Sequence, residues 1–149
     1  MGVNRLKIRP LEFDDFPKWL PLWDGNNLGV RDEAVTTETW SRLINKENKS
    51  VNGLCAQMGE EMMGIVHYIL HPTTGHINNV CYMQDLYVHP DHRRKGVGKR
   101  LVNEVTIIGT REKWARMYWL TQNNNMEAKA MYQNFGVKLN FTFYVLPIS

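Results

Sequence analysis

The sequence predicts one α/β domain (α+β by some schemes), with a mixed central sheet of about six to seven strands flanked by about four helices. Three observations predict this class. Residues 82–102 have the pattern of a buried strand, a short turn and a helix with a glycine-rich first turn. Residues 51–57 and 62–70 flank Gly59 as an antiparallel hairpin. A further strand over 115–120 follows the helix, and the order strand, helix, strand implies a parallel pair.

The first part of the chain predicts one strand and two helices. Residues 6–9 alternate apolar and basic side chains, as in a half-buried strand. A helix is expected to start near Phe16 and Pro17, where proline is tolerated in the first turn. Pro21 should shorten or kink it, and residues 24–27 should break it. A second short helix is expected to start at Thr36 or Thr37 and to end before Asn48.

The second part predicts a central strand, two helices and a final strand. Residues 79–88 are apolar on both faces, which suits a central strand. Apolar residues from Val97 to Ile108 recur at helical spacing, and this helix should end by about Lys113. A short helix over 128–135 is closed by glycine, and residues 137–145 alternate as a half-buried strand does.

The turn between the central strand and its helix is suited to binding an anion. A helix start presents unpaired N–H groups and the positive end of the helix dipole. Gly96 and Gly98 have no Cβ, so a ligand can approach the backbone closely. Residues 93–100 also hold five of the 18 basic residues and no acid. Four of these side chains can contact phosphate: Arg93, Arg94, Lys95 and Lys99.

Two better-known phosphate-binding patterns do not fit this turn. The Walker pattern ends in Gly-Lys-Ser/Thr, whereas Gly98-Lys99 is followed by Arg100. The dinucleotide fingerprint needs three spaced glycines after an early strand, and only two occur here, late in the chain. The turn is therefore expected to bind a diphosphate in another way.

Two motifs resemble those of the GNAT superfamily of N-acetyltransferases. Arg93-x-x-Gly96-x-Gly98 is similar to the acetyl-CoA loop of that family, and the preceding Asp-Leu-Tyr-Val looks like its fourth strand. Residues 125–137 resemble its second hallmark, Asn-x-x-Ala-x-x-Leu-Tyr-x-x-x-Gly-Phe, with Met131 for Leu and Val137 for Phe. The resemblance implies a single GNAT domain over residues 1–149 that uses acetyl-CoA as cosubstrate and no metal.

The resemblance also implies which residues bind the cosubstrate. In the family two parallel strands splay apart, which here leaves backbone groups of Leu86, Tyr87 and Val88 for the pantetheine arm. Asn125 and the turn after it would flank that arm, and the diphosphate would lie on the glycine-rich loop. The residues expected to bind acetyl-CoA are therefore Leu86, Tyr87, Val88, Arg93, Arg94, Lys95, Gly96, Val97, Gly98, Lys99, Asn125, Met126, Glu127 and Ala128.

Direct transfer of the acetyl group to a neutral amine needs two proton movements. Tyr132 matches the tyrosine that acts as general acid in the family, whereas its helical spacing alone favours a core tyrosine. Polyamine acetyltransferases of the superfamily carry Glu-Asp where this chain has Gln84-Asp85, and glutamine cannot accept a proton. Any role as base is therefore expected to fall to Asp85, to a chain of water molecules or to no side chain at all. Asp85 is otherwise expected to hold a cationic amine, or simply to accept hydrogen bonds from backbone N–H groups.

The resemblance leaves the acceptor open among a small cationic amine, an amino acid and a protein lysine. In the family the region between the first two helices shapes the acceptor pocket, which here means residues 23–35. Asp24, Asp32 and Glu33 are candidate contacts for a cationic acceptor, with an ordinary solvated loop as the alternative.

Two rival functions come from the same residues. Gln84 in place of a carboxylate favours a catalytically silent module that binds acyl-CoA, whereas Tyr132 argues against it. Nucleic-acid binding through residues 93–100 is the other rival. We favour the cosubstrate site, because a nucleic-acid surface usually spreads its basic residues along a face among aromatic or polar readers.

Composition limits the remaining classes. The chain has 149 residues, 43% hydrophobic and 22% charged, which is typical of a globular domain. No apolar run approaches the ~20 residues that span a membrane. Cys55 and Cys81 lie in apolar runs and are expected to be buried thiols in a reducing cytoplasm. Dimers are common in the GNAT superfamily, so a homodimer stays open.

Overall fold

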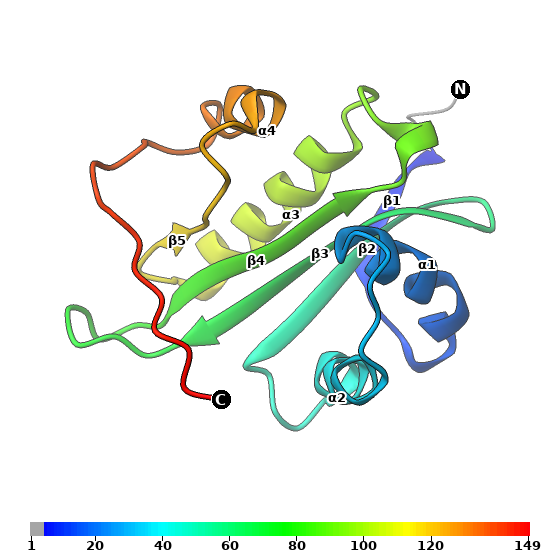
Figure 1. Cartoon of the computed structure of the whole chain (residues 1–149), viewed down its shortest axis with the longest axis horizontal. Coiled ribbons are helices and arrows are strands. Elements are labelled where there is room, and N and C mark those ends of the chain that lie inside the picture. Colours follow the sequence, from blue (N-terminus) through cyan, green and yellow to red (C-terminus); the bar gives the residue numbers. More distant parts are fainter. Residues whose placement is uncertain (1–4) are drawn as a thin grey trace. The chain divides into compact units, whose positions relative to one another are not determined.

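The computed structural model describes residues 5–149 and consists of two compact units, residues 5–119 and 120–149, each described here by itself. The first unit is built on a five-stranded mixed sheet in the order β1-β2-β3-β4-β5 (Figure 1). Its strands are β1 (Lys7–Pro10), β2 (Val51–Met58), β3 (Glu61–His71), β4 (Val80–Val88) and β5 (Met117–Tyr118). Neighbouring strands are antiparallel except β4 and β5, which are parallel as predicted.

Helices cover both faces of this sheet. In the first unit α1 (Phe16–Asn26) and α2 (Glu33–Ile44) lie on one face, and α3 (Val97–Glu112) lies on the other (Figure 1). Two short 3₁₀ turns, η2 (Phe13–Asp15) and η3 (Pro90–His92), precede α1 and α3, and α4 (Met126–Tyr132) belongs to the second unit. The α/β class and the four helices predicted from the sequence are confirmed over residues 5–149.

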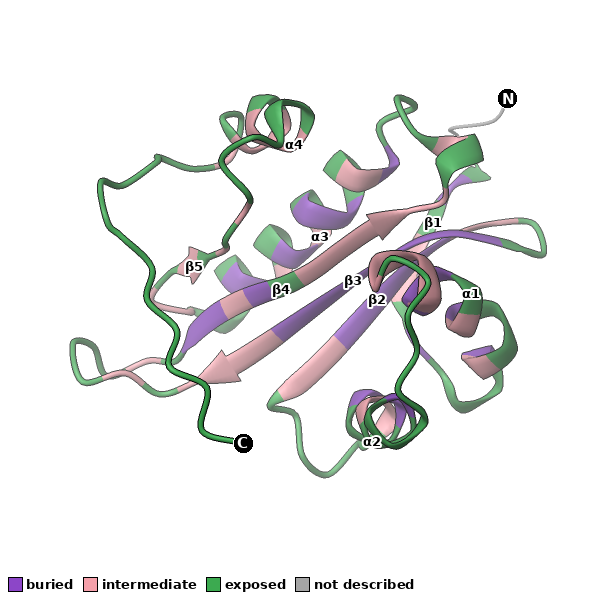
Figure 2. Ribbon diagram, in the orientation of Figure 1, coloured by how far each residue is buried: buried purple, intermediate pink, exposed green. Residues whose placement is uncertain are grey.

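Each face of the sheet has its own buried layer (Figure 2). On one face Trp19 is fully buried, with its ring centroid 5.2 Å from that of Trp23 and 4.8 Å from that of Trp40. On the other face α3 buries Val97, Leu101 and Val105 of the predicted stripe, together with Val102, whereas Ile108 is only partly buried. Cys55 and Cys81 are free and fully buried, and burial raises their pKa values to about 11 and about 12.

The predicted break in the first helix is wrong. α1 continues through Pro21 and through residues 24–26, and Asn27 ends it. Proline removes one helical hydrogen bond, but this cost is offset because the helix buries Trp19, Leu22 and Trp23. The extra turn is important for the site, because it brings Asn26 to the sheet.

The predicted start of the second helix is also wrong. α2 begins at Glu33, because Asp32 caps it: its Oδ1 accepts a hydrogen bond from the Val35 N–H at 3.0 Å. Thr36 is buried inside the helix, where its Oγ1 accepts a hydrogen bond from the Trp23 indole N–H at 2.9 Å. The threonine therefore anchors α1 to α2 and does not serve as a cap.

Fewer strands form than the six to seven predicted, and both corrections fall late in the chain. The strand predicted over 115–120 is reduced to Met117–Tyr118. Residues 137–145 form no strand and are exposed throughout. A strand needs a neighbour for its backbone groups, and the second unit contains a helix but no strand for this segment to pair with.

Candidate active site

One edge of β4 is open over most of its length. β5 pairs with it only at Cys81–Met117 and Tyr82–Tyr118, where the two tyrosine rings stack with centroids 4.9 Å apart. Within residues 5–149, no strand pairs with that edge of β4 from position 83 to Val88. The parallel strands therefore separate after a short contact, and no strand of the described residues pairs with the backbone groups at this edge of Leu86–Val88.

A bulge interrupts the other edge of β4. Opposite β3, His67 pairs with Asp85 whereas Tyr68 pairs with Met83, so Gln84 has no opposite residue. Such an extra residue bends a strand and redirects the side chains next to it. The regular alternation that the sequence predicts for Gln84 and Asp85 is therefore interrupted at this point.

The bulge decides which face Asp85 occupies. Tyr68 packs against Trp114 just after α3, with ring centroids 5.5 Å apart, so its partner Met83 lies on the α3 face. In a regular strand Asp85, two residues later, would share that face. Instead its Oδ1 accepts a hydrogen bond from Asn26 Nδ2 of α1 at 3.1 Å. The carboxylate thus lies on the α1 face.

Asp85 is held as an ionised carboxylate. Its Oδ2 lies 3.0 Å from Nδ1 of His67, which is 3% exposed, and the Asp85 side chain is 22% exposed. Burial favours the protonated carboxyl, but hydrogen bonds from His67 and Asn26 outweigh it and lower the pKa of Asp85 below its ordinary value. A partly exposed negative charge therefore stands beside the open edge.

Three residues around Asp85 are not predicted from the sequence: Asn26 and His67, which contact it, and Trp19, whose indole N–H donates a hydrogen bond to His67 Nε2. Asn26 was expected in a break after the first helix, and His67 had no signal beyond its place in a strand. The cross-strand pair His67–Asp85 depends on the bulge, and no local pattern of residues 79–88 predicts that bulge. The only sequence signal for a role of His67 was its position within a strand, and a histidine at such a position is usually a packed or surface residue.

The glycine-rich turn presents unpaired backbone donors, as predicted. Within the described chain, the N–H groups of residues 95–99 donate no hydrogen bond to the protein. Gly96 caps α3 with φ of 81°, a left-handed conformation that favours glycine, and a Cβ there would meet no atom within 4 Å. Five consecutive donors at a helix start fit a diphosphate.

Arg93 is engaged at the end of β4. Its Nε donates a hydrogen bond to the Val88 carbonyl at 2.9 Å, and its guanidinium carbon lies 5.2 Å from the centroid of the Tyr87 ring. The side chain thus ties the turn to the strand. Because Nε of Arg93 is already hydrogen-bonded to Val88, any contact of this side chain with a phosphate would be made by Nη1 and Nη2.

The second unit carries the other predicted residues. Asn125 caps α4, because its Oδ1 accepts a hydrogen bond from the Ala128 N–H at 3.1 Å, and Met126 and Glu127 form the first turn. Tyr132 is the last residue of α4 and is half-buried. Burial raises the pKa of the Tyr132 phenol, so its hydroxyl stays protonated near neutral pH.

The acidic residues expected to contact a cationic acceptor are engaged within the protein. Asp24 accepts two hydrogen bonds from Arg31, and Glu33 accepts one from the same guanidinium at 3.1 Å. Asp32 is occupied as the cap of α2. Asp85 is therefore the stronger candidate for binding a cation.

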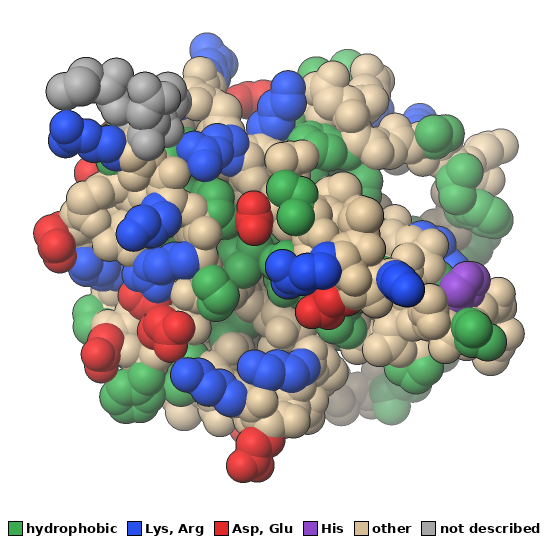
Figure 3. Space-filling view, turned by 180° about the vertical axis from the view of Figure 1, so that it is seen from behind, with side chains coloured by type: hydrophobic (Ala, Val, Ile, Leu, Met, Phe, Trp, Pro, Cys, Tyr) green, Lys and Arg blue, Asp and Glu red, His purple; other side chains and the backbone are tan. Residues whose placement is uncertain are grey.

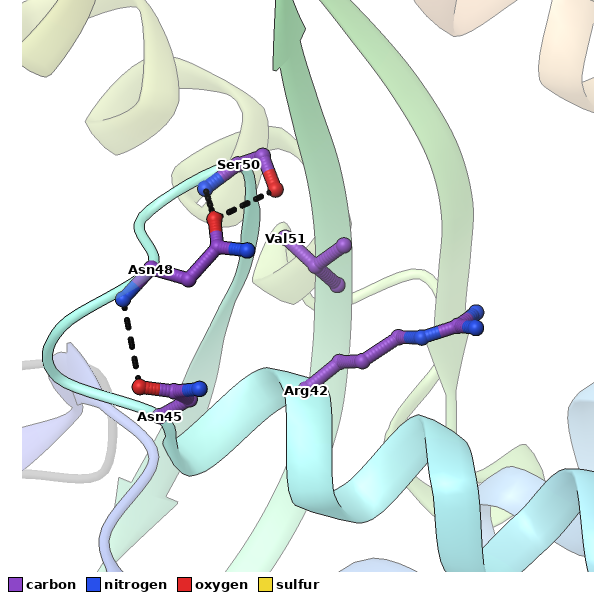
Figure 4. Close-up of a pocket in the computed structure, with 5 residues that line it drawn as sticks. All are labelled: Arg42, Asn45, Asn48, Ser50 and Val51. Carbon is purple, nitrogen blue, oxygen red and sulfur yellow. Dashed lines mark hydrogen bonds between the residues drawn. The ribbon is translucent and has the colours of Figure 1, made fainter.

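A surface hollow of about 250 Å³ lies elsewhere, where α2 leads into β2 (Figure 4). Polar groups that line this hollow form hydrogen bonds with one another. Ser50 donates to Asn48 Oδ1 through both its N–H and its hydroxyl group, and the Asn48 N–H donates to Asn45 Oδ1. It contains none of the predicted site residues, so we do not assign it to the chemistry.

Two further properties concern the described residues as a whole. Among residues 5–149, no group of three or more His, Cys, Asp or Glu side chains could hold a metal ion, and none of the helices has the length and apolar character to cross a bilayer. On the face seen in Figure 3, basic and acidic side chains are interspersed.

These features define a class of protein. A central strand with an open edge leads directly into a glycine-rich helix start, so the strand can pair with an extended ligand whose phosphates lie on the turn. An ionised carboxylate stands at the same edge. The class is an α/β protein whose open strand edge and unpaired N–H donors are suited to an extended phosphate-bearing ligand.

Comparison with known proteins identifies the family. The sequence model of the Acetyltransferase (GNAT) family matches residues 8–137, and the chain belongs to that family. It is therefore an acyltransferase. The resemblance predicted from the two motifs is confirmed.

Relatives and solved structures agree with this. The chain is 30% identical to the D-amino-acid N-acetyltransferase HPA3 of Saccharomyces cerevisiae, covering 97% of this chain and 92% of that protein. It is 31% identical to the thialysine N-epsilon-acetyltransferase of Caenorhabditis elegans over 58% of this chain and 53% of that protein. The structure of aminoglycoside N-acetyltransferase AAC(6')-Iy in complex with CoA has the same fold, with a TM-score of 0.79, 20% identity, and 96% and 95% of the two chains covered.

Proposed function

We propose that this protein transfers the acetyl group of acetyl-CoA directly to a primary amine of a small molecule, either a cationic amine or an amino acid. The two relatives described above are named for acetylation of amino acids, D-amino acids in one case and thialysine in the other. Their names favour a small acceptor over a protein lysine.

One observation carries the proposal: Asp85, the open edge of β4 and the unpaired N–H groups of residues 95–99 follow one another along a single stretch of chain. A ligand paired with Leu86–Val88 would have its phosphates at one end and its reactive group at the other. The carboxylate of Asp85 stands at that second end.

The residues present fit acetyl-CoA. The N–H groups of residues 95–99 would hold the diphosphate, with Arg94 adding positive charge, and backbone groups of Leu86–Val88 would hold the pantetheine arm. Asn125 and the first turn of α4 are proposed to flank that arm. When bound, acetyl-CoA supplies an acetyl group already activated as a thioester.

Two side chains are proposed to act on protons and charge. Asp85 accepts a hydrogen bond from the nitrogen of the acceptor amine and so holds it at the edge of β4. The nitrogen forms a bond to the acetyl carbon and loses its proton to solvent, while the bond from that carbon to sulfur breaks. The Tyr132 hydroxyl donates its proton to the departing sulfur and regains one from solvent. Burial raises the pKa of this phenol above its ordinary value, so Tyr132 carries its proton at neutral pH.

A thiol-release assay with acetyl-CoA tests the proposal. The acceptors are n-butylamine, 1,4-diaminobutane, D- and L-amino acids and a lysine-containing peptide, each compared with a reaction lacking amine. We expect release that depends on a small amine, and a loss of about 100-fold in kcat for Tyr132→Phe. Tyr144→Phe, an exposed tyrosine of the same unit, is the matched control. Release without any amine, or equal rates in the two variants, would contradict the proposal.

A further inference from the structure

Trp19, His67 and Asp85 form a chain of hydrogen bonds from the buried layer under α1 to the edge of β4. The Trp19 indole N–H donates to His67 Nε2 at 3.0 Å, and His67 Nδ1 lies 3.0 Å from Asp85 Oδ2. Trp19 is fully buried and His67 is 3% exposed, whereas the Asp85 side chain is 22% exposed. The chain is thus closed to water except at its carboxylate end.

The geometry fixes the tautomer of His67. An indole N–H can only donate, so Nε2 of His67 must offer its lone pair, and the ring hydrogen lies on Nδ1. That Nδ1–H donates to Asp85. The rings of Trp19 and Trp23, with centroids 6.0 and 5.7 Å from that of His67, restrict rotation of the imidazole. His67 is therefore a donor held in one orientation.

Asp85 receives one N–H on each of its two oxygens. His67 donates to Oδ2, and Asn26 donates to Oδ1 at 3.1 Å. Two donors from two different elements fix the carboxylate in position, and they stabilise its charged form. Such a carboxylate is a weak proton acceptor but a good partner for an ammonium group.

We propose that His67 is a positioning residue whose Nδ1–H holds Asp85 as a fixed, charged anchor for the ammonium group of the acceptor. Asp85 is the residue that touches the acceptor, His67 acts through it, and Trp19 sets the tautomer of His67. The inference rests on the proposed acetylation of amines. It assigns Asp85 to binding of the amine, and leaves removal of the proton from the ammonium group to water.

Two substitutions of His67 separate positioning from a general structural role. An Asn side chain places its amide near the position of Nδ1, so His67→Asn keeps a donor for Asp85 and loses the partner of Trp19. A Gln side chain reaches the position of Nε2, so His67→Gln keeps a partner for Trp19 and loses the donor for Asp85. Each variant loses one buried hydrogen bond, and their stabilities should be similar.

The kinetic test uses the small amine that the wild-type protein acetylates fastest. Loss of one hydrogen bond to a charged group corresponds to about tenfold or more in affinity. We expect His67→Gln to raise the KM for the amine about tenfold above that of His67→Asn, with equal KM values for acetyl-CoA. Equal amine KM values in the two variants, or a fall in kcat alone, would overturn the positioning role.

The second readout needs no turnover. ¹⁵N NMR of the wild-type protein is expected to show His67 with its hydrogen on Nδ1 and with Nε2 unprotonated. A wild-type spectrum with the hydrogen on Nε2 would refute the hydrogen-bonded chain. This measurement also applies if a His67 variant fails to fold.

The two proposals fail in different ways. If the wild-type protein acetylates none of the amines, the proposed function is refuted, and the role of Asp85 as an amine anchor falls with it. If amines are acetylated but the Asn and Gln variants behave alike, the function stands and the role of His67 is refuted.

Discussion

Gly25 of α1 lies so close to the Tyr87 ring of β4 that a Cβ at position 25 would overlap the ring, with 2.5 Å to its Cζ. Tyr87 is in turn covered by the guanidinium group of Arg93. The absence of a side chain at Gly25 therefore lets α1 approach β4. The same approach brings Asn26 within hydrogen-bonding distance of Asp85.

Gly25→Ala is expected to destabilise the protein, although alanine normally favours a helix over glycine by about 1 kcal/mol. Overpacking of this kind costs about 1–3 kcal/mol, so we expect a net loss of about 1 kcal/mol. The measurement is urea unfolding. Gly75→Ala, where a Cβ would meet no atom within 4 Å, is the control and should be neutral. A more stable Gly25→Ala variant would contradict the close approach.

Gly96→Ala is expected to weaken binding of CoA. Gly96 and Gly29 have φ values of 81° and 80°, and a Cβ at either would meet no protein atom within 4 Å. Alanine should therefore strain both positions equally, by about 1–2 kcal/mol.

Only position 96 lies among the donors proposed for the diphosphate. We expect isothermal titration calorimetry to show a Kd for CoA about tenfold higher in Gly96→Ala, a difference of about 1.4 kcal/mol, and an unchanged Kd in Gly29→Ala. Equal Kd values in the two variants would place the diphosphate elsewhere.

The ion pair of Arg9 and Asp15 predicts a dependence of stability on pH. Asp15 is 7% exposed and accepts hydrogen bonds from Arg9 at 2.8 and 2.9 Å, which lower its pKa despite burial. A carboxyl group whose pKa is lower in the folded state than in the unfolded state, where it is near 3.9, stabilises the folded state at every pH above that unfolded value. This contribution is lost as the pH falls through the pKa of the folded state.

Asp15→Asn should therefore lower the free energy of unfolding at pH 7 by about 2 kcal/mol and show a shallower loss of stability below about pH 4. The measurement is urea unfolding across a pH series. The exposed neighbour Asp14→Asn controls for the loss of one negative charge. An acid slope as steep in Asp15→Asn as in the wild type would refute the prediction.

The sequence was most informative where local chemistry decides the structure. The glycines at 96 and 98 and the basic residues around them predicted the turn and its unpaired donors. The first N–H groups of any helix have no hydrogen-bond partner within the helix. Asp85 stood out for the same kind of reason, since a carboxylate in an apolar strand needs partners.

The rest depended on tertiary contacts. The face that Asp85 occupies follows from one unpaired residue, Gln84, which alters the register of β3 against β4. The length of α1 follows from the burial of its tryptophans, which outweighs Pro21. The period-2 pattern of residues 137–145 is a real β-strand signal, but a pattern supplies no pairing partner. Local periodicity therefore overestimated the sheet and missed the histidine beside Asp85.

The hydrogen bond from Trp23 to Thr36 links α1 and α2, and its loss should be measurable. The Trp23 Nε1–H donates to Thr36 Oγ1 at 2.9 Å, and the two residues are 8% and 2% exposed. Thr36→Val keeps the volume but removes the acceptor, which leaves a buried donor unsatisfied at a cost of about 1–3 kcal/mol. Thr36→Ser keeps the acceptor and loses one methyl group, worth about 0.8 kcal/mol. We expect urea unfolding to show the larger loss of stability for Thr36→Val. The opposite order would mean that packing of the methyl group, and not the hydrogen bond, joins the two helices.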